Sequence, residues 1–212
     1  MSAREEILGR IRAALPAGRD AVRQAEYAEI DRQYQAAPVL PLEEKIALFR
    51  ERLEDYNAEV HRCAPAGVAA TVAQVLRARG KSGLLIAEGT PGGWLPDGFS
   101  FTKDDGQAYK ELDRSEGVLT GCAAAIALTG TIVVRHGSEQ GRRALSLVPD
   151  YHLCVVPLEL LVETVPEGLR RMAAMLPAPL TTISGPSATA DIEMIRVKGV
   201  HGPRTLEVIL VG

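Results

Sequence analysis

Apolar residues recur along the chain in two patterns, helical spacing and short continuous runs. Helical spacing begins near residues 3, 42 and 68, and Thr164-Val-Pro-Glu167 predicts a further helix that starts with a capping box. A short helix is also predicted within residues 140–149. Runs typical of strands lie at residues 57–63, 82–89, 117–121, 129–137, 151–157, 179–184 and 205–211.

Strands and helices therefore alternate, which predicts an α/β domain over residues 41–212 with a largely parallel sheet flanked by helices. Residues 1–40 are predicted to form an N-terminal helical arm, because a capping box at Ser2 and Glu5 is followed by a polar, alanine-rich segment. Open sheets of this kind bind ligands outside the carboxyl ends of their strands. Glycine-rich segments that follow strands are therefore the first places to search for function.

Composition and charge exclude several classes of protein. The net charge is −3, which gives no electrostatic case for a nucleic-acid partner. No apolar run approaches the ~20 residues that span a bilayer, and the charged N-terminus lacks the apolar centre of a signal peptide. These features indicate a cytoplasmic protein without a membrane span.

Metal-binding patterns are missing from the sequence. The cysteines, Cys63, Cys122 and Cys154, are far apart and form no Cys-x-x-Cys, which disfavours a zinc ribbon or an iron–sulfur site within the chain. The four histidines also lack metal-ligand spacing, and no standard catalytic signature is present. We therefore expect no metal site and no cofactor in this chain.

Residues 184–203 concentrate turn-forming and polar residues directly after a predicted strand. Gly185 and Pro186 predict a sharp turn, and Ser187 or Thr189 could cap a short helix that begins near Ala188 or Ala190. The free N–H groups at such a helix start favour an anion. Gly185, Ser187 and Thr189 are thus candidate ligand-binding residues.

The same segment carries groups suited to acid–base chemistry. Asp191 and His201 are the candidate catalytic residues, and Glu193 is a further candidate ligand-binding residue. Asp191 and Glu193 lie two positions apart, so on a helix they would not face the same way. In the alternative interpretation, Asp191 only holds backbone N–H groups and His201 is a solvated turn residue.

A second candidate segment is TGTIVVRHGSEQGRR at residues 129–143. Gly130 and Thr131 would let a ligand approach the backbone before a strand, and Arg142 belongs to a basic group after that strand. The alternative interpretation is a solvated helix face. We expect Gly130–Thr131, the Arg142 region and Ser187–Asp191 to meet at the carboxyl edge of one sheet.

LTTISGPSATADIEMIRVKGVHGPRTLEVILV near the C-terminus, together with TGTIVV and QGRRALSLVPDYHLCVV, resembles the LUD domain family, specifically its lactate utilisation protein C (LutC/YkgG-like) members. The resemblance implies a NagB/RpiA/CoA-transferase-like fold. It also implies a component of an L-lactate utilisation system that acts with iron–sulfur partner proteins, which would carry the clusters.

One residue departs from the family pattern. Members commonly have an acidic residue where this chain has Leu128, and a leucine can neither transfer a proton nor attack an acyl group. The first hypothesis is therefore an accessory component that binds an anionic small molecule and docks on iron–sulfur subunits. The alternative is a stand-alone enzyme of CoA-transferase or isomerase type, acting on a carboxylate, thioester or sugar phosphate.

Overall fold

The computed structural model describes the chain except residues 1, 16–18, 32, 34–36, 190–196 and 200–201, and it contains two compact units. The first unit is Met1–Gln35 and the second is Ala36–Gly212. Each unit is described by itself. None of the described helices is both long and apolar enough to cross a membrane.

The N-terminal unit contains two helices, α1 (Ala3–Ala14) and α2 (Arg19–Glu29). The capping box predicted at the start of α1 is confirmed: the Ser2 hydroxyl accepts from Glu5 N, and the Glu5 carboxylate accepts from Ser2 N. No described residue of α1 is buried. The sequence analysis did not predict α2, which consists mostly of residues with high helix propensity but has no continuous apolar stripe.

The larger unit is built on a six-stranded sheet in which all neighbouring strands are parallel. In spatial order the strands are β1 (Glu59–Cys63), β12 (Thr205–Val211), β7 (Tyr151–Pro157), β4 (Val118–Thr120), β2 (Gly83–Ile86) and β3 (Ser100–Lys103). The central strands β7 and β12 are almost entirely buried, because helices or other strands cover both faces.

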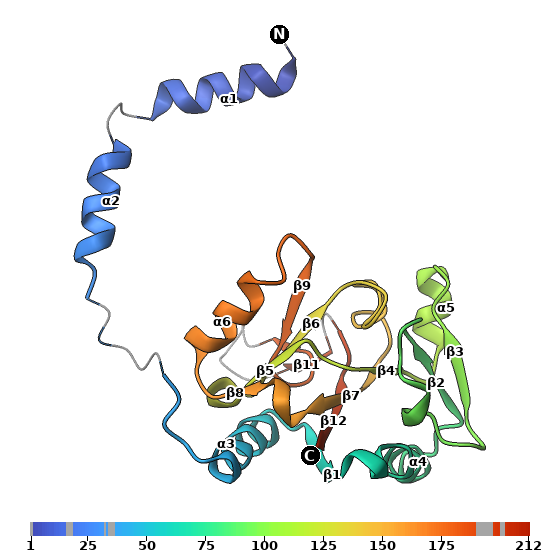
Figure 1. Cartoon of the computed structure of the whole chain (residues 1–212). Helices are drawn as coiled ribbons and strands as arrows, with labels where there is room; N and C mark the ends of the chain where they lie inside the picture. Colours follow the sequence, from blue (N-terminus) through green and yellow to red (C-terminus); the bar gives the residue numbers. More distant parts are fainter. Residues whose placement is uncertain (1, 16–18, 32, 34–36, 190–196, 200–201) are drawn as a thin grey trace. The chain divides into compact units, whose positions relative to one another are not determined.

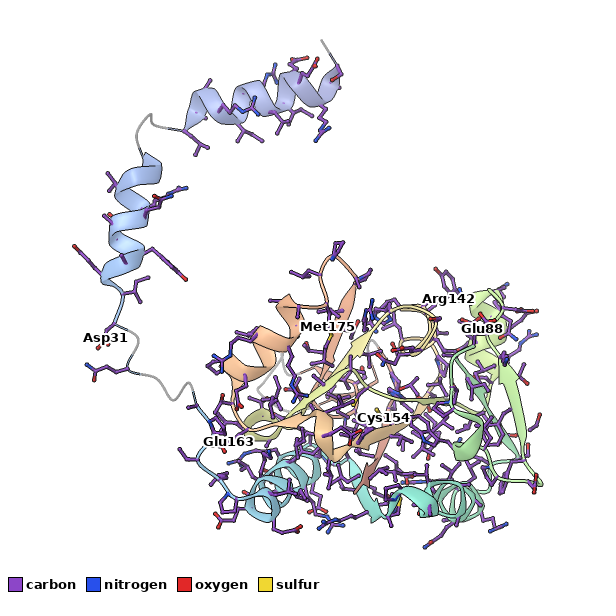
Figure 2. The ribbon with its side chains drawn as sticks, in the orientation of Figure 1. Asp31, Glu88, Arg142, Cys154, Glu163 and Met175 are labelled. Carbon is purple, nitrogen blue, oxygen red and sulfur yellow. The ribbon has the colours of Figure 1, made fainter. Side chains whose placement is uncertain are left out.

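Apolar helix faces cover the two sides of this sheet. Helix α4 (Val68–Ala78) packs against residues such as Leu153 and Ile209 on one face. Helix α3 (Leu42–Asp55) packs against the opposite face, where Cys154 and Val208 lie. Figure 1 shows α3 and α4 on either side of β1, and Figure 2 shows Cys154 inside this layered core.

A second, four-stranded sheet lies on the α3 side of the first. Its order is β8 (Leu161–Val162), β5 (Ala124–Ile126), β6 (Thr131–Arg135) and β9 (Leu180–Ile183). Strand β6 runs antiparallel to both of its neighbours, whereas β5 and β8 are parallel. Helix α6 (Val165–Ala173) begins with the predicted capping box at Thr164 and packs on this sheet through Gly168, which lies against Ile126.

Shorter elements complete the larger unit. They are α5 (Tyr109–Arg114), the strand pair β10 (Ala188–Thr189) and β11 (Val197–Lys198), and the 3-10 helices η1 (Pro65–Gly67), η2 (Gly92–Trp94), η3 (Ala127–Thr129) and η4 (Leu158–Leu160).

The predicted fold class is confirmed: the structure is α/β with a largely parallel sheet, flanking helices and an N-terminal helix. Three local predictions are wrong. Residues 140–149 form turns instead of a helix, and Ala188 begins a strand instead of a helix. The strands at β6 and β9 belong to the second, mostly antiparallel sheet, because long-range pairing and not local pattern sets strand direction.

Residues 39 and 40 are tied to the larger unit by a buried carboxylate. Glu163, 2% exposed, accepts hydrogen bonds from Val39 N at 2.9 Å and from Leu40 N at 2.7 Å. A buried carboxylate that loses such donors is destabilising. The segment that precedes α3 is therefore part of the structure of the larger unit.

Deleting residues 1–35 is expected to leave a cooperatively unfolding protein, because this unit is compact by itself. The melting temperature should change by less than about 4 °C, which corresponds to ~1 kcal/mol for a chain of this size. Deleting residues 1–40 is the matched control, because it also removes both N–H donors to Glu163. Circular-dichroism melts should show a clearly lower melting temperature for the longer deletion. Loss of cooperative unfolding in the shorter one would contradict the prediction.

Candidate functional site

A hollow of about 210 Å³ lies where the two sheets meet. His152 and Leu206, at the amino ends of β7 and β12, form part of its wall, and Thr181–Ala188 approach it from the carboxyl end of β9. The turn that contains Arg143 and Ser146 completes the wall. The site therefore lies at the amino ends of the parallel strands β7 and β12, although the sequence analysis expected carboxyl ends.

The loop after β9 is shaped by a glycine. Gly185 has φ of 90°, and a Cβ at this position would lie 2.4 Å from Cβ of Tyr56, so no other residue fits here without movement. Backbone hydrogen bonds then fix the loop: Ser187 N donates to Pro203 O at 2.7 Å, and Gly199 N donates to Ser187 O at 3.0 Å. Gly185 and Ser187 both line the hollow.

A row of hydroxyl groups connects this loop to the start of β6. Ser184, which lines the hollow, has its Oγ 2.8 Å from Oγ1 of Thr131, and Thr131 Oγ1 is 2.7 Å from Oγ1 of Thr129. Gly130 between them has φ of 58°, and a Cβ there would lie 2.8 Å from Cβ of Arg52 on α3. Gly130 thus allows α3 to approach closely and is a packing residue in this structure.

His152 is a fully buried imidazole in the wall of the hollow. It is 1% exposed, and burial lowers its pKa to about 4, so the ring is neutral at physiological pH. Its Nε2 lies 2.7 Å from Oγ1 of Thr120 on the neighbouring strand β4. Its Nδ1 has no hydrogen-bond partner among the residues that the structure describes.

The two adjacent arginines of the predicted basic group have different environments. Arg142 points away from the hollow toward α5 and β3 (Figure 2), where it donates to both oxygens of Asp104, at 2.7 and 3.0 Å, and to Gln107 O. These hydrogen bonds lower the pKa of Asp104. Arg143 is exposed and lines the hollow, with NH1 at 3.5 Å from the Ser146 hydroxyl.

The structure thus brings some of the predicted site residues together. Gly185 and Ser187 line the hollow, and Thr131 reaches it through Ser184, whereas Arg142 is engaged elsewhere. Thr189 lies in β10. The remaining candidates, Asp191, Glu193 and His201, lie outside the described residues.

The sequence analysis missed His152 and Arg143 as site residues. The one available signal for His152 was its position in YHLCVV, where a histidine interrupts an otherwise apolar central strand. For Arg143 there was no signal that separated it from Arg142.

A separate cluster, Glu59, His61 and Glu207, has the ligand types of a metal site on β1 and β12. Its atoms are already paired: His61 Nε2 lies 2.8 Å from Glu207 Oε2, and Arg79 donates to both Glu207 and Glu59. The guanidinium therefore already supplies positive charge to these carboxylates.

Comparison with known proteins identifies the family. The LUD domain model matches residues 94–211, which is more than half of the chain. The chain belongs to the LUD domain family. This LUD protein is 46% identical over 167 residues to Lactate utilization protein C of Deinococcus radiodurans, covering 77% of this chain and 78% of that protein.

Two further relatives support the assignment. The uncharacterized protein YkgG of Escherichia coli is 31% identical over 109 residues, which is 47% of each chain. A crystal structure of a DUF162 family protein from Deinococcus radiodurans has 39% sequence identity and a TM-score of 0.70, covering 82% of the LUD chain and all of the solved one.

Leu128 is half exposed in this LUD protein. Its side chain is 46% exposed, and its backbone N–H donates to the Glu163 carbonyl at 3.0 Å. A leucine side chain offers no proton donor or nucleophile at this position.

Proposed function

We propose that this chain is a component of an L-lactate utilisation system and binds a small carboxylate in the hollow. The relatives named Lactate utilization protein C support the pathway. The observation that supports the ligand is the composition of the wall: a cation, Arg143, stands among serine and threonine hydroxyls, and no described lining residue carries a carboxylate. Guanidinium and hydroxyl groups are suited to hold a carboxylate.

The size of the hollow favours a small acid. Its volume of about 210 Å³ is below the range of ~300–1,000 Å³ that is usual for pockets binding drug-sized ligands. A three-carbon acid has few atoms to enclose, so a small hollow with several polar groups can surround most of it.

Iron–sulfur partner proteins are the proposed site of electron transfer. Burial raises the pKa of Cys154 to about 12, although the Thr120 hydroxyl opposes this shift, and burial also raises the pKa of Cys122. Cluster ligation requires thiolates, and these two thiols are held protonated. Their state is consistent with clusters that are bound by partner chains.

Reconstitution tests the proposal against a stand-alone enzyme, for which no feature of the described site argues specifically. L-lactate and an artificial electron acceptor would be given to the chain alone, to the iron–sulfur proteins alone, and to the combination. We expect turnover only in the combination. Turnover by the chain alone would favour the enzyme alternative, and full turnover without the chain would show that it is not a component.

Replacing Arg143 with glutamine is expected to weaken L-lactate binding at least ~10-fold, about 1.4 kcal/mol, because the carboxylate loses its charged donor. Isothermal titration calorimetry at constant salt measures this change. Arg142→Gln is the matched control, because its guanidinium is bonded to Asp104 outside the hollow. Equal weakening by both variants would indicate a general charge effect and contradict the assignment of Arg143.

A further inference from the structure

The imidazole of His152 has one nitrogen that the fold does not use. Nε2 is bonded to the Thr120 hydroxyl, whereas Nδ1 is buried and has no partner among the described residues. Buried polar atoms in native proteins are rarely left unpaired, because the loss of hydration is not repaid. Since His152 lines the hollow, a group inside the hollow is the natural partner of Nδ1.

The role of Nδ1 as donor or acceptor depends on the Thr120 hydroxyl. A neutral imidazole carries its proton on one nitrogen and accepts at the other. If Thr120 donates to Nε2, the ring proton is on Nδ1, which then donates. If Nε2 donates to Thr120, the hydroxyl proton can turn toward Cys154 Sγ, 3.9 Å away, and Nδ1 accepts.

We propose that His152 determines the specificity of the hollow, with Nδ1 bonded to the oxygen on C2 of a 2-hydroxy or 2-keto monocarboxylate whose carboxylate is held by Arg143. This inference rests on the proposed carboxylate site. A 2-hydroxyl group donates to Nδ1, and a 2-keto oxygen accepts from Nδ1–H. The hydroxy acid and the keto acid therefore bind with similar affinity, and an acid without a C2 oxygen binds weakly.

The discrimination has a physical cause. An acid that lacks the C2 oxygen would leave Nδ1 desolvated and unpaired, and sites built to hydrogen-bond a polar group strongly reject analogues that lack it. Arg143 contributes equally to all monocarboxylates, since each carries the same charged group. The two residues thus have separable effects, one on the ratio of affinities and one on all affinities together.

Titrations of the full chain with L-lactate, pyruvate and propionate test the inference. For the wild type we expect L-lactate and pyruvate to bind within about 3-fold of each other and propionate at least ~10-fold more weakly. In His152→Phe the three acids should bind with equal affinity. In Arg143→Gln all three should weaken while their ratios remain.

The outcomes separate the two proposals. If the acids bind through Arg143 but wild-type protein does not distinguish propionate from L-lactate, the role of His152 is refuted and the carboxylate site stands. If none of the acids binds, or Arg143→Gln has no effect, the carboxylate site itself is refuted, and this inference with it.

A spectroscopic measurement on the wild type makes the test independent of how well His152→Phe folds. The ¹⁵N signals of the ring nitrogens can be followed because the chain has only four histidines. Saturating pyruvate should shift Nδ1 of His152 toward the protonated range, and saturating L-lactate toward the unprotonated range. An Nδ1 signal that neither acid changes would overturn the inference.

Discussion

Lowering the pH from 7 to 5 is expected to reduce the free energy of unfolding by about 2 kcal/mol through His152 alone. Burial lowers the pKa of this imidazole to about 4 from its ordinary 6.5. Between these values the unfolded chain binds a proton that the folded chain does not, so protonation favours unfolding. The contribution is fully present above pH 6.5 and is lost as the pH falls, reaching about 3 kcal/mol below pH 4.

Urea unfolding of the wild type and of His152→Phe at pH 7, 6 and 5 measures this contribution. The comparison between the two proteins is needed because burial also lowers the pKa of His136, which destabilises the fold in the same direction. The variant should lose about 2 kcal/mol less than the wild type over this range. Parallel pH dependences would show that His152 is protonated in the folded protein.

Replacing Glu207 with glutamine is expected to lower the free energy of unfolding by about 3 kcal/mol, the scale for removing one partner of a buried ion pair. The Glu207 side chain is 2% exposed and is bonded to His61 and Arg79. Burial raises the pKa of Glu207, but the hydrogen bonds from His61 and Arg79 outweigh burial, so the net shift is downward. An amide of the same shape keeps the packing and loses the charge.

Glu59→Gln is the matched control, because this carboxylate bonds to the same Arg79 but has a side chain that is 60% exposed. An exposed ion pair contributes less than about 1 kcal/mol, so the control should be close to the wild type in urea unfolding at pH 7. The two variants would have similar stability if burial did not strengthen the Glu207 interactions, and that result would contradict the prediction.

The pH dependence of the Glu207 contribution has the opposite origin to that of His152. Because the pKa of Glu207 is lowered in the folded state, its contribution is present above its ordinary value of 4.5 and is lost as the pH falls through the folded value. The loss associated with His152 begins at higher pH, near 6.5. Measurements at pH 5 and above therefore report mainly on the histidine.

Strands buried on both faces were the elements that could be predicted most directly. In β12 (Thr205–Val211), six consecutive residues after Thr205 are buried, and such a strand needs apolar side chains at nearly every position. By contrast, β3 (Ser100–Lys103) is a mostly exposed edge strand with the polar sequence SFTK, and no local pattern indicates it. Strand β5 (Ala124–Ile126) lies in a run of small residues that gave no clear period.

The candidate site was only partly visible in the sequence. The loop at Gly185 and Ser187 could be found because glycine and proline mark a turn after a strand. Arg142 and Arg143 have the same local signal, but Asp104, 38 residues earlier, binds the first and leaves the second at the hollow. For His152, the Thr120 contact spans 32 residues, so the sequence could not reveal that one nitrogen is satisfied and the other is not.

By itself, the sequence determined the fold class, the main buried strands and the starts of α1 and α6, because apolar periodicity and capping residues act over a few neighbouring positions. Only the tertiary structure decided that β6 and β9 form a second sheet with antiparallel pairing, and that a hollow lies at the amino ends of β7 and β12. A local pattern records that a strand is buried, but hydrogen-bond partners, strand direction and cavities depend on segments far apart in the chain.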